Sequence, residues 1–256
     1  MVKTLILDIE TSPIMGKVWS LWEQNLSLDQ IENDWFIMSY AAKWLDGEDI
    51  YYNDCRESIG EDFQLLSELH GLLNEADIIV AHNGDKFDIP KINARLLLNG
   101  LPPPSPYKTI DTLKMAKRTF KFTSNKLAYL TDALCTNKKQ KHVKFAGWTL
   151  WNECMAGNNE AWEEMYEYNC MDVISLEELY LILRPWMPNH PTIGAFDDLE
   201  VCSCPKCNSS KVVKRGFFHT SKGKYQRYIC TDCGGWSSAT TTINTKEKRQ
   251  SLLASR

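Results

Sequence analysis

The stretch "KTLILDIET" (3–11) combines an apolar, β-branched run with two acidic residues, Asp8 and Glu10. This composition and short length predict a buried strand that ends near Glu10. Because side chains alternate along a strand, both carboxylates should point to the same face. Two acids on a buried face repel each other unless a cation lies between them, although such a pair also occurs as ordinary surface acids at a strand end.

Apolar runs and helical periodicity predict the other elements of this part of the chain. Four more strands are expected at 35–45, 49–54, 77–83 and 107–112. Apolar residues at helical spacing and terminating Gly or Pro residues predict helices at 61–76, 89–100, 112–120, 125–135, 149–156 and 158–184. Strands with intervening helices, followed by helices alone, indicate an α/β layer fold.

Composition excludes several classes of protein. Hydrophobic residues make up 43% of the 256 residues, and nine are Trp, which is ample for a packed core. The N-terminal apolar run is too short for a signal peptide, and no uncharged apolar stretch approaches the length of a membrane span. We therefore expect a cytoplasmic protein with reduced thiols and no membrane partner.

Two later motifs add acidic residues that could join the first pair. In "AHNGDKFDIP" (81–90), Asp88 opens a predicted helix, where it could equally be an ordinary first-turn acid. In "MYEYNCMDV" (165–173), Tyr168 and Asp172 are four residues apart and share one helix face. An Asp at the edge of that face could project over the end of the first strand.

The last quarter of the chain differs in charge and in cysteine spacing. Residues 201–256 carry 11 Lys and Arg against two acids, whereas residues 1–200 carry 18 against 31, which suggests an anionic partner or a solubilising tail. Two CxxC pairs predict one structural Zn²⁺ held by tetrahedral thiolates, with Cys202 as a possible replacement for Cys204. The four expected ligands are Cys204, Cys207, Cys230 and Cys233.

The segments 211–220 and 224–231 between these pairs predict a β-hairpin. Basic and aromatic residues alternate there, which suits phosphate contact and base stacking, although some aromatics could simply pack the hairpin. The predicted domains are 1–186, a proline-containing linker at 187–200, a zinc-binding unit at 201–243 and a basic tail at 244–256.

The motifs "LDIET", "AHNGDKFDIP" and "YNCMD" resemble, in order and spacing, the three motifs of DEDD-superfamily 3′→5′ exonucleases. Tyr168, four residues before Asp172, matches the tyrosine-bearing subgroup, and the likeness extends over residues 1–185. The C-terminal segment resembles zinc ribbons, and the whole resembles stand-alone phage exonucleases. The resemblance implies a ribonuclease H-like fold with a mixed five-stranded sheet flanked by helices, plus a small zinc-ribbon hairpin.

The resemblance also implies roles for individual residues. Asp8, Glu10, Asp88 and Asp172 would hold two Mg²⁺ or Mn²⁺ ions, Tyr168 would lie beside the attacking water, and Asp111 would be a supporting acid. Two-metal hydrolysis of a phosphodiester agrees with this set of oxygen ligands. By the same resemblance, Asn83 and Phe87 could touch the terminal nucleotide. The residue pattern itself suggests phosphate contacts in a basic loop, which could also be an ordinary solvated loop, and on the hairpin; these are Lys138, Lys139, Lys141, Lys214, Arg215 and Arg227.

Three functions are compatible with the sequence. The first is a metal-dependent 3′→5′ exonuclease acting on nucleic acid, with single-stranded DNA favoured over RNA. The second is an endonuclease or RNA-processing nuclease on the same fold, and the third is a non-catalytic nucleic-acid-binding protein. A separate replication or recombination partner is possible, and a phage-encoded protein would act in the host cytoplasm.

Overall fold

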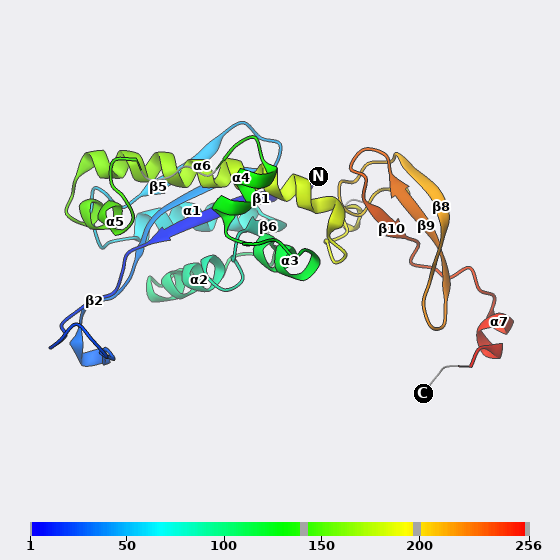
Figure 1. The fold of residues 1–256 in the computed structure, drawn as a ribbon, viewed down its shortest axis with the longest axis horizontal. Coiled ribbons are helices and arrows are strands. Elements are labelled where there is room, and N and C mark those ends of the chain that lie inside the picture. Colours follow the sequence, from blue (N-terminus) through cyan, green and yellow to red (C-terminus); the bar gives the residue numbers. More distant parts are fainter. Residues whose placement is uncertain (1, 139–142, 197–200, 254–256) are drawn as a thin grey trace. The chain divides into compact units, whose positions relative to one another are not determined.

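The structure, a computed structural model, describes residues 2–138, 143–196 and 201–253. The chain forms two compact units, one of residues 3–180 and one made mainly of the residues from 181 onward (Figure 1). The finer domain boundaries expected from the sequence stay a prediction. No helix in the described ranges has both the length and the apolar character needed to cross a lipid bilayer.

A mixed five-stranded sheet forms the centre of the first unit, with the strand order β5-β4-β1-β6-β7. β1 pairs antiparallel with β4 and parallel with β6. The five strands are β1 (Thr4–Thr11), β4 (Ile37–Trp44), β5 (Ile50–Asp54), β6 (Ile78–Ala81) and β7 (Lys108–Asp111). All five lie within the segments that the sequence predicts, and the predicted fold class is confirmed.

Helices cover both faces of this sheet (Figure 1). They are α1 (Phe63–Glu75), α2 (Asp88–Leu98), α3 (Thr112–Thr119), α4 (Leu127–Leu134), α5 (Trp148–Met155) and α6 (Asn159–Leu183). Leu5, Leu7 and Ile9 of β1 pack in one buried cluster with leucines of α1 and with Ile92 of α2. These odd-numbered residues of β1 therefore face α1 and α2.

The opposite face of the sheet carries α6. Lys43 of β4 forms an ion pair with Glu177 of α6, with 2.5 Å between Nζ and Oε2. Ser39 of β4 lies opposite Glu10 of β1 in the strand register, and its hydroxyl contacts Asn169 of α6. The even-numbered residues of β1, including Asp8 and Glu10, therefore lie on the side of the sheet that α6 covers.

A projecting segment between β1 and β4 was not expected from the sequence. It consists of residues 13–34, which we call the arm, and contains β2 (Met15–Gly16), β3 (Ile31–Asn33) and a 3₁₀ turn, η1 (Leu28–Gln30). β2 and β3 pair antiparallel as a separate two-stranded sheet. Strands of two and three residues are too short for alternation to reveal them in the sequence.

The second unit contains a three-stranded antiparallel sheet in the order β10-β9-β8. Strands β8 (Val212–His219) and β9 (Lys224–Cys230) form the predicted hairpin, and β10 (Trp236–Ser238) adds an edge strand that the sequence did not predict. The remaining elements of the unit are the 3₁₀ turns η2 (Arg184–Trp186) and η3 (Ile193–Ala195) and the helix α7 (Lys246–Ser251).

Candidate metal centre

Three acids from opposite ends of the first unit's sequence meet at the end of β1. Asp8 and Glu10 lie two residues apart on this strand, and Asp172 comes from α6. One carboxylate oxygen of each lies within 4.8 Å of those of the other two. Asp172 is buried, and both other acids are half-buried. Oxygen atoms gathered in this way are suitable ligands for a hard divalent cation.

Asp88 lies close to this group but outside it. It is the first residue of α2, is buried, and its Oδ1 accepts a hydrogen bond from the backbone N–H of Ile9 at 3.2 Å. Burial is the main cause that raises the pKa of Asp88 to about 7, and the charge of Asp111 adds to this effect. Asp88 thus contacts the backbone between Asp8 and Glu10, while its role as a fourth metal ligand stays a prediction.

Asn169 is a residue of the site that the sequence did not reveal. Its side chain is fully buried, and its Nδ2 donates a hydrogen bond of 2.6 Å to Oδ2 of Asp8. Its Oδ1 accepts a hydrogen bond of 3.1 Å from the buried hydroxyl of Ser39. An Asn three residues before Asp172 shares the buried face of α6, but the sequence alone does not say which strand residue it meets.

Tyr168 lies on α6 one turn before Asp172. It is half-buried and packs against the cluster around Trp162, with its ring edge-on to that of Trp151 at 6.3 Å between centroids. This packing fixes the position of the ring. Its expected place beside an attacking water stays a prediction.

The turn after β6 carries two of the expected substrate contacts. Asn83 has a left-handed backbone, with φ at 74°, and its N–H donates to Oδ1 of Asp111 at 3.1 Å. Phe87 precedes α2 and packs against the buried cluster beneath that helix. Asp111 also accepts from the backbone N–H of Lys114, so this acid fixes the turn that leads to Asp88. Whether Asn83 and Phe87 touch a substrate stays a prediction.

The basic loop before α5 is described only in part. Lys138 forms an exposed ion pair with Asp132, with 2.7 Å between Nζ and Oδ1. Lys139 and Lys141, which were expected to contact phosphate, lie outside the described residues. Their predicted role is therefore neither supported nor contradicted.

The second unit assembles four cysteines in the way that the two CxxC pairs predict. The Sγ atoms of Cys204, Cys207, Cys230 and Cys233 all lie within 4.8 Å of one another. Cys202 is exposed and lies outside this group, so it does not replace Cys204 in the cluster. Burial acts to raise the pKa of Cys230, but hydrogen bonds from the backbone of Cys233 and Asp232 and from neighbouring thiols lower it to about 7. Burial raises the pKa of the neighbouring Cys207 and Cys233, so the proximity of the four Sγ atoms, and not their pKa, indicates a metal site.

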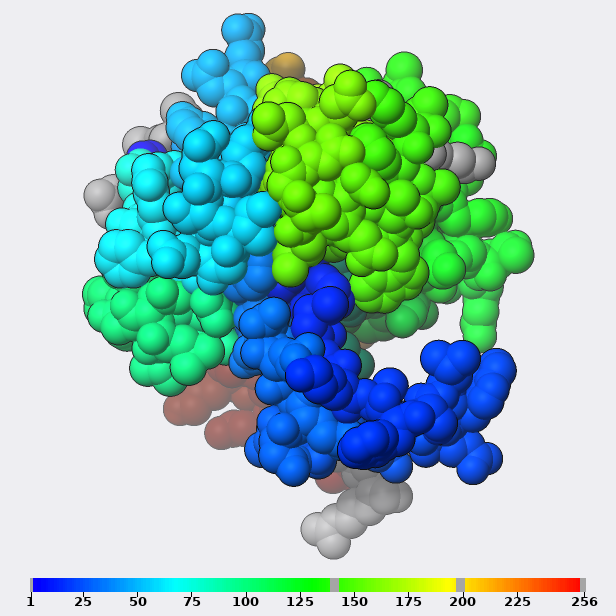
Figure 2. Space-filling view, turned by 90° about the vertical axis from the view of Figure 1, so that its left-hand side faces the viewer, coloured from blue at the N-terminus to red at the C-terminus, as the bar shows by residue number. Residues whose placement is uncertain are grey.

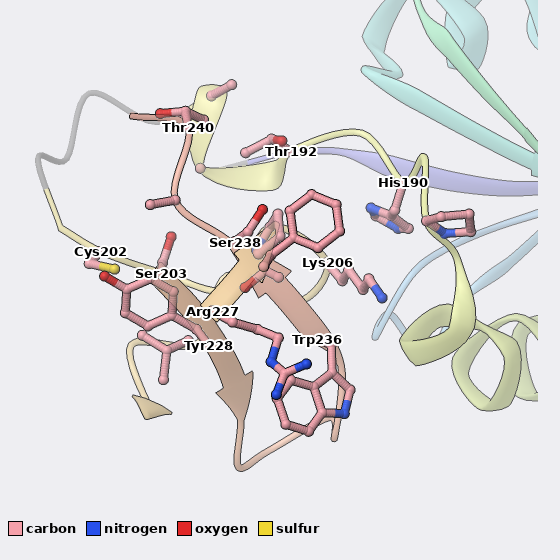
Figure 3. Close-up of a pocket in the computed structure, with 18 of the residues that line it drawn as sticks. His190, Thr192, Cys202, Ser203, Lys206, Arg227, Tyr228, Trp236, Ser238 and Thr240 are labelled. Atoms are coloured by element: carbon pink, nitrogen blue, oxygen red, sulfur yellow. The ribbon is translucent and has the colours of Figure 1, made fainter. Parts of the chain in front are cut away.

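The remaining basic residues of the prediction lie on the small sheet. Lys214 and Arg215 are exposed on β8, and the guanidinium of Arg227 on β9 lies 4.7 Å from the ring centre of Trp236 (Figure 3). Nε of Arg227 also donates to the backbone oxygen of Arg215 at 2.9 Å. Arg227 and Trp236 line a hollow of about 770 Å³ in this unit, together with Tyr228, Lys206 and His190. Contacts of these residues with nucleic acid stay a prediction.

Comparison with known proteins supports the fold and the extent of the first unit. The RNase_H_2 family model, described as RNase_H superfamily, matches residues 5–184. Among solved structures, the chain is similar to the family B DNA polymerase from the hyperthermophilic archaeon Pyrobaculum calidifontis, with a TM-score of 0.52 and 14% sequence identity. That match covers 72% of this chain and 25% of the polymerase, and at such low identity it concerns the fold alone. No curated protein sequence matches the chain significantly.

Proposed function

Because the chain belongs to the RNase H superfamily and gathers three acids at the end of its central strand, we propose that it is a metal-dependent nuclease, and specifically a 3′→5′ exonuclease. The observation that carries this proposal is the meeting of Asp8, Glu10 and Asp172 within 4.8 Å. Three carboxylates at this distance are costly to hold together without a cation between them.

The donor set fits Mg²⁺ or Mn²⁺ better than a soft metal. The three acids offer only oxygen atoms, whereas zinc sites are mostly built from sulfur and nitrogen. In the proposal Asp8, Glu10 and Asp172 hold the cations, and Asp88 joins them once it loses its proton. Two bound cations would lower the pKa of the attacking water and stabilise the leaving 3′ oxygen.

The protein residues around the acids have separate tasks in this proposal. Asn169 holds the carboxylate of Asp8 in place through its 2.6 Å hydrogen bond. Tyr168, whose ring packs edge-on to that of Trp151, has the task of orienting the attacking water. In this proposal the hydroxyl of Tyr168 donates a hydrogen bond and does not act as a base.

Labelled nucleic acids test the direction and the substrate. With Mg²⁺ or Mn²⁺, a single-stranded DNA labelled at its 3′ end should release labelled mononucleotides at once, and a 5′-labelled strand should shorten stepwise. Asp172→Asn should abolish both reactions. Cuts within a circular single strand would contradict the exonuclease proposal and favour an endonuclease. Faster digestion of RNA than of DNA would show that RNA is the preferred substrate.

Replacing Tyr168 by Phe tests the role given to its hydroxyl. Because only the phenolic oxygen is lost, Tyr168→Phe should keep the packing against Trp151 and retain metal and substrate binding. Turnover should fall by about 100- to 1,000-fold, the range that removal of one oriented hydrogen-bond donor commonly gives. Steady-state kinetics and a cation titration measure both quantities, and full turnover in the variant would remove Tyr168 from the mechanism.

For the second unit, we propose one structural Zn²⁺ bound by the four clustered cysteines. The sheet of this unit is small, and metal binding would supply free energy that a core of this size lacks. The excess of Lys and Arg in residues 201–256 supports nucleic acid as its partner. We expect single-stranded DNA, because the alternating basic and aromatic residues of the hairpin suit phosphate contact and base stacking.

A further inference from the structure

The arm (residues 13–34) exposes large apolar side chains to an unusual degree. The side chain of Trp19 is 95% exposed and that of Trp22 is 82% exposed. The side chains of Leu21 and Leu28 are exposed to a similar extent. Fully exposed indoles usually mark a binding surface, because burying such large apolar side chains against a partner is energetically favourable. The arm is therefore a candidate surface for a partner.

Hydrogen bonds within the arm hold the backbone that carries the exposed indoles. Lys17 N–H donates to the backbone oxygen of Gln30 at 3.0 Å, which closes the arm beyond β2 and β3. Nε2 of Gln24 donates to the hydroxyl of Ser20 at 2.6 Å and to the backbone oxygen of Trp22 at 2.8 Å. These bonds fix the turn between Trp19 and Gln24. The indoles are thus presented by a defined local structure.

The base of the arm lies beside the candidate metal centre. Thr11, the last residue of β1, directly follows Glu10, and Ser12 exchanges two hydrogen bonds of 3.0 Å with the backbone of Phe36. The arm leaves the sheet only two residues beyond a proposed metal ligand. Figure 2 shows the arm (blue) projecting from the surface, with an open notch between it and the neighbouring green segments.

Charge decides what kind of contact the arm can make. Residues 13–34 contain one basic residue, Lys17, against four acids, and Lys17 is already paired with Glu32 at 2.6 Å. The arm therefore cannot attract phosphates. Exposed indoles can instead stack on bases, which is sequence-tolerant and requires no positive charge. A base can be stacked in this way only when it is free of its complementary strand.

We infer that Trp19 and Trp22 form a stacking platform for the unpaired bases of a single nucleic-acid strand whose end lies at the acidic cluster. This inference rests on the proposed nuclease function and extends it, because it assigns a contact for the bases behind the scissile phosphate. It also gives a physical reason for a preference for single strands. Duplex bases are stacked on one another and present no free face to the arm.

Kinetics with two substrates tests the platform. In the double variant Trp19→Ala/Trp22→Ala, KM for a single-stranded oligodeoxythymidylate should rise at least about tenfold, since one stacked base is worth about a factor of ten or more. The turnover number should change less than about twofold. Hydrolysis of the p-nitrophenyl ester of thymidine 5′-phosphate should be unaffected, because this substrate has a single nucleotide and no further bases that could reach the arm.

Two further variants separate stacking from folding. Trp19→Phe/Trp22→Phe retains flat rings and should keep KM within about threefold of the parent. Trp148→Ala removes an indole that is 69% exposed outside the arm, and it should leave KM unchanged. The thermal unfolding midpoint should be the same for all variants, because each replaced side chain is exposed. The ratio of KM between alanine variant and parent should not change with salt, since no phosphate contact is lost.

A binding experiment decides the inference even if no hydrolysis occurs. In an Asp172→Asn background, oligodeoxythymidylate should quench tryptophan fluorescence, and the amplitude of quenching should fall clearly in Trp19→Phe/Trp22→Phe but not in Trp148→Phe. Absence of hydrolysis by the parent protein would contradict the proposed function, while this quenching would still support the platform. Equal quenching in Trp19→Phe/Trp22→Phe and the parent, together with parental affinity in Trp19→Ala/Trp22→Ala, would overturn it, and the arm would then face a protein partner instead.

Discussion

At the scale of single residues, Asn169 shows how a neutral side chain can define a charged site. Its amide joins Asp8 of β1 to Ser39 of β4, with hydrogen bonds of 2.6 and 3.1 Å. A carboxylate restrained by a buried amide keeps one orientation when a cation arrives. Side chains that orient metal ligands in this way commonly change metal affinity by 10- to 100-fold when they are removed.

Replacing Asn169 by Ala should therefore weaken binding of Mn²⁺ by about tenfold or more. The affinity falls because the carboxylate of Asp8 can rotate once its hydrogen bond to Asn169 is lost. No ligand of the proposed centre is itself removed. Isothermal titration calorimetry with Mn²⁺ measures the effect. Asn152→Ala, which replaces an exposed Asn on α5, is the matched control and should bind Mn²⁺ as the parent does. Equal affinities in both variants would show that Asn169 has only a structural role.

Asp88 gives a pH-dependent prediction for the protein without Mg²⁺ or Mn²⁺. Burial raises its pKa from 3.8 to about 7 in the folded state. Below about pH 4 Asp88 is protonated in both the folded and the unfolded state, so its raised pKa does not lower the free energy of unfolding. As pH rises from about 4 to about 7 the unfolded state loses its proton first, so the free energy of unfolding should fall, by up to a few kcal/mol.

The variant Asp88→Asn cannot ionise, and its Oδ1 can still accept from Ile9. It should therefore be more stable than the parent above about pH 7, and the difference should vanish near pH 4. Urea unfolding at a series of pH values measures this difference. Parallel stability curves for the two proteins would contradict the raised pKa.

At the scale of elements, the turn from β6 into α2 decides where Asp88 lies. Gly84 stands in this turn, and a Cβ added there would come within 2.4 Å of the Cβ of Ala81. Real side chains do not approach each other this closely. The turn therefore requires glycine because the backbone of residue 84 passes close to Ala81, and not because of an unusual φ. Asp111 holds the same turn through the N–H of Asn83.

The substitution Gly84→Ala should destabilise the first unit by about 1–3 kcal/mol, as overpacking commonly does. The shifted turn should also weaken the contact between Asp88 and Ile9, so the affinity for Mn²⁺ should fall in the same variant. Gly71→Ala is the matched control, since nothing lies within 4 Å of its added Cβ and helix α1 should gain from alanine. Chemical denaturation measures the stability of both variants, and calorimetry measures their affinity for Mn²⁺. A Gly84→Ala protein with the stability and Mn²⁺ affinity of the parent would contradict the close approach of Gly84 to Ala81.

At the scale of the whole molecule, the two units gather different kinds of candidate metal ligand. Carboxylates gather in residues 3–180, and cysteines gather in the unit that follows. Hard and soft ligand sets select different metals, so the units should be loaded independently. Loss of zinc should leave the acidic cluster intact.

Cysteine variants test this separation. Cys204→Ser should lose zinc and bind single-stranded DNA more weakly, while Cys202→Ser should retain both properties, because only Cys204 belongs to the cluster. Both variants should hydrolyse the mononucleotide ester at the parent rate. Zinc content by plasma mass spectrometry and ester kinetics check these outcomes, and zinc loss in Cys202→Ser would mean that this residue is a ligand.

The elements with strong local patterns were predicted correctly. Helix α6 and the strands of the five-stranded sheet have clear periodicity, and the CxxC spacing identified the cysteine cluster. Segments of two or three residues, such as β2, β3 and β10, lack enough residues for any period to show. The arm was therefore missed, although its tryptophans are evident in the sequence.

The sequence by itself determined which candidate side chains share a face within one element, because alternation along β1 pairs Asp8 with Glu10 and the four-residue spacing on α6 pairs Tyr168 with Asp172. Only the tertiary structure decided how these faces meet. It brought Asp172 to Asp8 and Glu10, left Asp88 just outside that group, placed Asn169 against Asp8 and exposed the indoles of the arm. Contacts between distant segments depend on packing across the sheet, which no local pattern encodes.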